Sequence, residues 1–73
     1  MSRLTHVEYE ILERAGVDGT RVAIRQRGRR EHIVIPLRLV LKGGREVIEA
    51  KNQTTGRAIE IDLDDVEHVE VVR

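Results

Sequence analysis

The 73-residue chain has no cysteine, phenylalanine or tryptophan, and it contains one tyrosine and one proline. Without cysteine, neither a disulfide framework nor a zinc site with thiolate ligands can form, and a reducing interior is the natural compartment. Without Phe or Trp, the core has to be built from Val, Ile and Leu, which favours a small β structure. We expect one domain over residues 1–73. Because a domain of this size buries only ~60% of its unfolded surface, helix docking or self-association should add to its stability.

Long hydrophobic runs are also missing. The longest, Ile33–Leu37 and Leu39–Leu41, are far shorter than the ~20 residues that span a bilayer. The N-terminus Met1–His6 has no apolar core of the kind found in signal peptides. We therefore expect a cytoplasmic protein with no membrane partner.

The charges cancel in total but are sorted along the chain. Residues 1–20 contain two basic and four acidic residues, a net charge of −2. Residues 21–45 contain eight basic residues against Glu31 alone, a net charge of +7. Residues 46–73 contain three basic and eight acidic residues, a net charge of −5. This sorting limits which partners are plausible and indicates where they would bind.

The N-terminal segment predicts a helix over about residues 6–15. Thr5 followed three residues later by Glu8 forms a capping box, which fixes the start of the helix. Gly16 suits the left-handed conformation that commonly ends a helix. A helix of this length is marginal alone, so it has to dock on the rest of the molecule. The predicted docking face is the apolar stripe of Val7, Ile11, Leu12 and Ala15.

Residues 21–41 read as a hairpin followed by an ambiguous segment. Val22–Arg25 is a first strand, Arg27–Arg30 has the length and glycine of a hairpin loop, and His32–Ile35 is the returning strand. Pro36 cannot donate to a strand ladder, so it marks a bulge, a strand end or a sheet edge. Residues 37–41 fit either a strand or a short helical turn.

The second half predicts three further short strands. Arg45–Lys51 is a strand with Ile48 and Ala50 on the covered face, and the last strand is built on Val69 and Val71. Between them, Ile59, Ile61 and Leu63 alternate inward against outward acidic residues. Strands this short hide their edges by curling. We therefore predict a mainly β (α+β) fold, a small five-stranded Sm-like barrel over about residues 21–73 with one N-terminal helix.

No residue pattern indicates catalysis or metal binding. His6, His32 and His68 fall on different predicted elements and lack the spacing that places two imidazoles on one face. The aspartates of residues 62–65 lack the glycine and distal glutamate of a calcium loop. We predict a non-enzymatic protein with no catalytic residue, no metal site and no cofactor.

The basic hairpin is the main candidate site. Guanidinium groups on a loop reach phosphates without desolvating a core, and each phosphate contact adds a salt dependence. Specific binding of single strands usually adds stacking aromatics, which this hairpin lacks, so we expect electrostatic contact of low selectivity. The candidate nucleic-acid-binding residues are Arg25, Arg27, Arg29 and Arg30.

Two alternatives remain open for these charges. In the first, basic strands lie opposite acidic strands of the same molecule and form ordinary surface ion pairs. In the second, the acidic and basic faces bind a protein partner or mate between copies in a homo-oligomer. The candidate protein-interaction residues are Glu60, Asp62, Asp64 and Asp65.

From Val22 onward the chain resembles the WYL domain, a small Sm-like barrel of bacterial transcription regulators. The matching segments are Val22–Arg25, Ile35–Val40 with its proline, Lys42–Arg45 and Ile61–Val66. Where the family has the motif that gives it its name, this chain has Glu46–Ile48, without the tryptophan and the tyrosine. The resemblance implies an Sm-like barrel and a role connected with transcription.

The order of the last two strands is also similar to the Rho-binding antiterminator family, another Sm-like barrel. That resemblance implies protein contact through acidic residues, in keeping with the acidic second half of this chain. We therefore expect a small binding or regulatory module that contacts nucleic acid through the basic hairpin. The alternative is a protein-interaction or self-assembly module with complementary basic and acidic faces.

Overall fold

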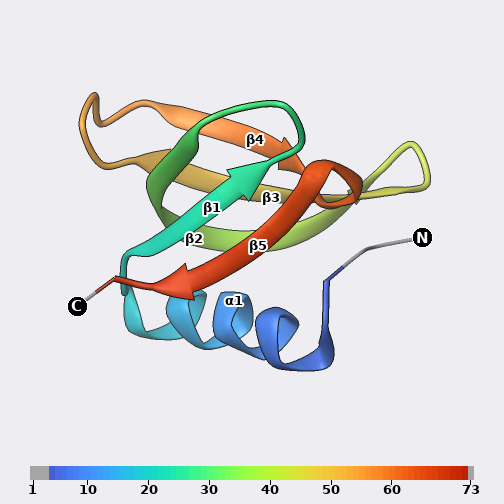
Figure 1. Cartoon of the computed structure of the whole chain (residues 1–73), viewed down its shortest axis with the longest axis horizontal. Helices are drawn as coiled ribbons and strands as arrows, with labels where there is room; N and C mark the ends of the chain where they lie inside the picture. Colours follow the sequence, from blue (N-terminus) through green and yellow to red (C-terminus); the bar gives the residue numbers. More distant parts are fainter. Residues whose placement is uncertain (1–3, 73) are drawn as a thin grey trace.

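The computed structural model describes residues 4–72, and the ends of the predicted domain, residues 1–3 and 73, lie outside the described part. One helix is followed by five antiparallel strands in the sheet order β4-β3-β2-β1-β5 (Figure 1). The predicted class, mainly β with one N-terminal helix and five strands, is confirmed. In chain order the elements are α1 (His6–Asp18), β1 (Val22–Gln26), β2 (Glu31–Lys42), β3 (Arg45–Asn52), β4 (Ala58–Asp62), the 3₁₀ turn η1 (Leu63–Asp65) and β5 (Val66–Val71).

Helix α1 starts where the capping box predicts. The Thr5 hydroxyl accepts a hydrogen bond from the Glu8 amide, and the Thr5 amide donates to the Glu8 carboxylate, both at 3.1 Å. The predicted end at residue 15 is wrong, since the helix continues to Asp18 and Gly19 caps it at a φ of 70°. Gly16 lies inside the helix, next to the backbone of β2. Packing on β2 therefore outweighs the low helix propensity of glycine.

The docked face of α1 is narrower than the predicted stripe. Leu12 and Ala15 are buried and Ile11 is partly buried, as expected. Val7 is 64% exposed, so its predicted place in the core is wrong. It lies in the first turn of the helix, where its side chain lines a surface groove. Within residues 4–72, no helix is both long and apolar enough to cross a membrane.

Strand β2 winds the sheet around the core. Its first part, Glu31–Val34, pairs with β1, and its remainder pairs with β3. The β2–β3 register shifts between Pro36 and Arg38, so of the three possibilities at the proline, a bulge, a strand end or a sheet edge, the bulge is the one present. The ladder resumes beyond the bulge, so residues 37–41 are strand and the predicted strand end at Ile35 is wrong.

The core lies between the coiled sheet and α1. Ile48 and Ala50 are buried as predicted, and so are Ile61 and Leu63. Three consecutive β1 residues are buried, which indicates that both faces of this strand are covered. The buried cluster consists of Leu12, Ala15, Val22, Ile24, Val34, Ile48, Ala50, Ile61, Leu63, Val66 and Val69.

Strand β5 contains both predicted residues, Val69 and Val71, but it begins earlier than predicted, at Val66. Val66 is buried although it precedes the predicted strand, because the β1–β5 register shifts between Arg25 and Gln26 and brings Val66 opposite Gln26. Val69 is buried as expected. Val71 lies on the same side of β5 as Val69 by strand alternation but is 42% exposed, so it lies outside the core. It lies where a groove separates β5 from α1.

Candidate functional site

The basic hairpin, residues 25–30, connects β1 to β2 on the side of the molecule away from α1 (Figure 1). The turn is closed by the Arg29 amide, which donates to the Gln26 carbonyl at 3.1 Å. Gly28 lies at a φ of 68°, a conformation that other residues adopt only with strain. All four candidate arginines are exposed.

The hairpin is anchored to η1 through Arg27. The Arg27 amide donates to the Asp65 carbonyl at 2.7 Å, and its guanidinium Nη2 donates to the Asp64 carbonyl at 3.4 Å. Both acceptors are backbone oxygens, so neither contact is an ion pair. The turn is thus held beside the β4–β5 connection while its charges remain at the surface.

The acidic residues of β4 pair with a different group of cations. Asp62 lies 3.3 Å from Arg45 Nη1, and Glu60 pairs with Lys42. Lys42 Nζ also lies 3.6 Å from Glu49, whose pKa is held below its ordinary value mainly by a hydrogen bond from Arg38. The resulting cross-strand ion-pair band runs over β2, β3 and β4 and consists of Arg38, Lys42, Arg45, Glu49, Glu60 and Asp62.

The structure therefore divides the predicted acidic set, whereas the four candidate arginines stay together in the hairpin. Glu60 and Asp62 belong to the ion-pair band, whereas Asp64 and Asp65 lie in η1 beside the hairpin. Asp62 also accepts a hydrogen bond from the Asp64 amide at 3.0 Å, which caps η1. In the described part of the chain, none of the four hairpin arginines forms an ion pair with a carboxylate. The cations that neutralise β4 come from the segment after Pro36.

A polar link that the sequence did not indicate joins α1 to β5. One oxygen of Glu8 completes the capping box, and the other accepts from the Val69 amide at 3.0 Å and lies 3.1 Å from His68 Nδ1. The second ring nitrogen of His68 lies 2.9 Å from Glu70. Only the doubly protonated imidazolium donates to both carboxylates. We call this arrangement the Glu8–His68–Glu70 link.

The link shifts the pKa of two of its members. Partial burial of the Glu8 carboxyl opposes ionisation, but the backbone hydrogen bonds from Thr5 and Val69, with smaller contributions from the Thr5 hydroxyl and His68, outweigh it and lower the pKa of Glu8. The hydrogen bond to Glu70 raises the pKa of His68 above its ordinary value, against a smaller effect of burial. The capping box identified Glu8 in the sequence. Its second role depends on the tertiary position of β5.

The remaining side chains that could take part in catalysis or metal binding do not gather at one site. His6 contacts Glu10 one turn along α1 at 3.0 Å. Tyr9, the single aromatic residue, donates to the Glu46 carboxylate on β3, and this hydrogen bond raises the pKa of Tyr9 to about 12. Its ring belongs to α1 and provides no stacking surface at the hairpin. Across residues 4–72, no group of three or more His, Asp or Glu side chains is arranged to hold a metal ion.

Comparison with known proteins shows a similar fold in a larger protein. The solved structure of proteasome accessory factor B/C (PafBC) of Arthrobacter aurescens matches with a TM-score of 0.77 at 24% sequence identity. The match covers 86% of this chain and 11% of that chain, so this chain spans a small part of the length of PafBC. No protein-family model matches the sequence, and a search of curated proteins finds no match. The similarity shows the fold, one helix on a coiled five-stranded sheet.

Proposed function

We propose that this chain is a small non-enzymatic regulatory module, connected with bacterial transcription, whose basic hairpin binds the phosphate backbone of nucleic acid. The similarity to PafBC supports a WYL-like fold, and we assign the coiled sheet to the Sm-like barrels. One observation carries the binding proposal. In residues 4–72 the hairpin arginines form no ion pair with a carboxylate, whereas Glu60 and Asp62 are neutralised by Lys42 and Arg45.

The chemistry of the hairpin defines the expected mode of binding. Arginine guanidinium groups donate two parallel hydrogen bonds to phosphate oxygens. No aromatic ring lies in the hairpin to stack on a base, so sequence selectivity should be weak. Four phosphate contacts on a single strand predict a slope of log K against log salt of about −3.

The test is a fluorescence-anisotropy titration of the full chain with labelled single-stranded RNA and DNA at about 50 and 200 mM salt. The variant Arg29→Gln/Arg30→Gln removes two charges whose side chains form no hydrogen bond or ion pair within residues 4–72. Arg27 is retained because it anchors the hairpin to η1. The matched control Lys51→Gln/Arg57→Gln removes two exposed charges outside the hairpin.

We expect wild type and control to bind with similar affinity at low salt, and the hairpin variant to bind about tenfold or more weakly. Binding by wild type should fall steeply between the two salt concentrations. The absence of binding at low salt, or equal losses in the hairpin variant and the control, would contradict the proposal.

Self-assembly through complementary charges is the second candidate. Asp64 and Asp65 lie beside the hairpin, so one surface presents acidic and basic groups side by side, a pattern that a second copy can complement. In this case sedimentation should show association at low salt. Both high salt and the Arg29→Gln/Arg30→Gln variant should weaken that association. A monomer at every salt and protein concentration would exclude it.

A further inference from the structure

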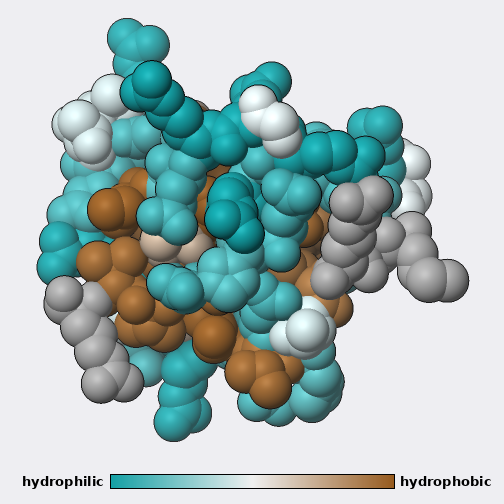
Figure 2. Space-filling model, in the orientation of Figure 1, coloured by the Kyte–Doolittle hydropathy of each residue, from teal (hydrophilic) through white to brown (hydrophobic). Residues whose placement is uncertain are grey.

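The exposed aliphatic side chains are clustered around α1. Among residues 4–72, six large hydrophobic side chains are exposed, and four of them line two grooves that flank the helix. The other two, Ile33 and Leu41, lie outside both grooves. Figure 2 shows hydrophobic surface along α1 and over the C-terminal end of β5. Single exposed aliphatics are ordinary, but a cluster of this kind marks a contact surface. The four clustered residues are Val7, Val17, Leu37 and Val71.

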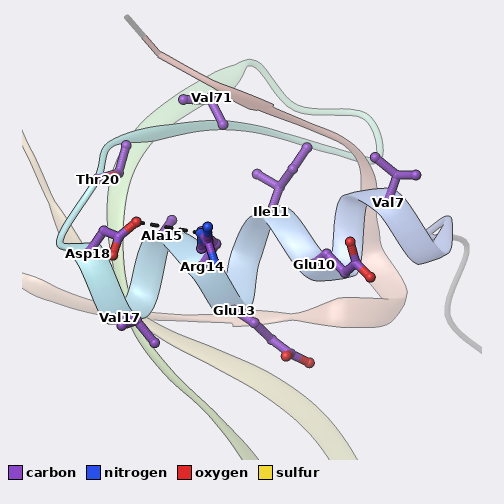
Figure 3. A pocket seen from close by; sticks show the side chains of 10 residues that line it. All are labelled: Val7, Glu10, Ile11, Glu13, Arg14, Ala15, Val17, Asp18, Thr20 and Val71. Atoms are coloured by element: carbon purple, nitrogen blue, oxygen red, sulfur yellow. Dashed lines mark ion pairs between the residues drawn. The ribbon is translucent and has the colours of Figure 1, made fainter.

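The larger groove, which we call the β5 groove, lies between α1 and β5 and has a volume of about 780 Å³. In Figure 3, Ile11 projects from α1 toward the strand segment that carries Val71, and Val7 follows along the helix. Val17 is 85% exposed at the other end of the groove. The groove therefore presents an aliphatic lining over most of the length of α1.

Acidic groups dominate the rim of this groove. Its charged residues are Glu10, Glu13, Asp18 and Arg14, a net charge of −2. Arg14 is directed to Asp18, 3.9 Å away, as Figure 3 shows. The rim complements a basic partner. It also disfavours a second copy of the same surface, because two acidic rims would face each other across a two-fold axis.

The occupant has to bind through side chains and not as an added strand. The β5 amide of Val69 already donates to Glu8, so part of the edge that an incoming strand would use is occupied. Five of the ten residues that line the groove are charged or polar, but they are spread along the chain from Glu10 to Thr20 and do not gather around one point where they would orient a small molecule. An amphipathic helix remains, since its aliphatic residues at i, i+3, i+4 and i+7 fit a groove of this kind.

We propose that the β5 groove is a docking site for an amphipathic helix of a partner protein, with aliphatic residues on one face and lysine or arginine on its flanks. The aliphatic residues contact Ile11 and Val71, and the basic flanks face Glu10 and Glu13. The observations that support this docking site do not depend on the basic hairpin. The groove also lies on another side of the molecule (Figure 1). A module with both surfaces joins a phosphate-bearing ligand to a protein.

The test uses the full chain and two helix-forming probe peptides with the same leucine spacing, one with lysine flanks and one with glutamate flanks. Binding is measured by fluorescence anisotropy, and the contacted methyl groups are mapped by NMR. The variant Val7→Asn/Val17→Asn changes two exposed groove residues. Its control is Leu41→Asn, which alters a side chain 72% exposed outside both grooves. Circular dichroism confirms that each variant is folded.

We expect the lysine peptide to bind at the groove methyl groups and the glutamate peptide to bind at least about tenfold more weakly. Val7→Asn/Val17→Asn should weaken binding about tenfold, and Leu41→Asn less than about twofold. Glu10→Gln/Glu13→Gln should reduce the salt dependence. Equal binding of both peptides, equal effects of groove and control variants, or dimerisation through the groove would overturn the proposal.

Discussion

Replacing Glu8 by glutamine is the sharpest perturbation of the fold, because this carboxylate joins α1 to β5. One oxygen accepts from Thr5, and the other accepts from the Val69 amide and contacts His68. Glutamine keeps a single uncharged acceptor, so one end of the link has to lose its partner. The side chain of Glu8 is only 12% exposed, so water replaces the lost contact poorly.

A hydrogen bond to a charged group contributes about 1.5–3 kcal/mol, so we expect Glu8→Gln to lower the free energy of unfolding by about 2 kcal/mol. In a domain of this size that loss lowers Tm by roughly 10 °C. Urea denaturation followed by circular dichroism measures the first quantity, and thermal melting measures the second. Glu10→Gln is the matched control, since Glu10 lies on the same helix, is 66% exposed and contacts His6. It should change stability by less than about 0.5 kcal/mol. Equal effects of the two substitutions would refute the structural role of the link.

Three further predictions concern stability and ionisation. Gly16→Ala should raise the free energy of unfolding by about 0.5–1 kcal/mol, because the added methyl meets its nearest neighbour at 3.6 Å inside a helix; a lower urea midpoint would contradict this. The link should stabilise the fold most between pH 4.5 and 6.5, the ordinary pKa values of Glu8 and His68. Stability from His68, whose pKa is raised, is lost as pH rises through its folded pKa, and stability from Glu8, whose pKa is lowered, is lost as pH falls through its folded pKa. Melting above pH 6.5 should therefore show a Tm that declines as pH rises, and His68→Asn should reduce this decline, whereas an unchanged decline would count against the link. In an ultraviolet titration Tyr9 should ionise near pH 12, and Glu46→Gln should lower that pKa, whereas a wild-type pKa of about 10 would exclude the hydrogen bond.

Elements defined by local chemistry were predictable from the sequence. The start of α1 depends on two residues three apart, and both capping-box hydrogen bonds form. Because Pro36 has no amide hydrogen, a bulge, a strand end or a sheet edge was predictable there, and the structure shows the bulge. The end of α1 was not predictable in this way, because Gly16 remains helical only through its packing on β2.

Features that depend on strand register could not be predicted from the sequence. The burial of Val66 depends on the register shift opposite Arg25 and Gln26. No residue of β5 indicates this shift in the sequence. The ion-pair band likewise depends on the β3–β4 register, which brings Asp62 opposite Val47 and within reach of Arg45. The basic hairpin could therefore be identified from the sequence. Only the structure showed which basic residues pair with the acidic residues of β4.

The salt dependence of binding to single-stranded RNA tests the central claim most directly. Wild type and Arg29→Gln/Arg30→Gln are titrated at several salt concentrations, and the slopes of log K against log salt are compared. Each lost phosphate contact removes about 0.7 from the slope, so we predict a slope shallower by about 1.4 in the variant. The Lys51→Gln/Arg57→Gln control should keep the wild-type slope. Equal slopes in wild type and hairpin variant would show that these arginines do not contact phosphate.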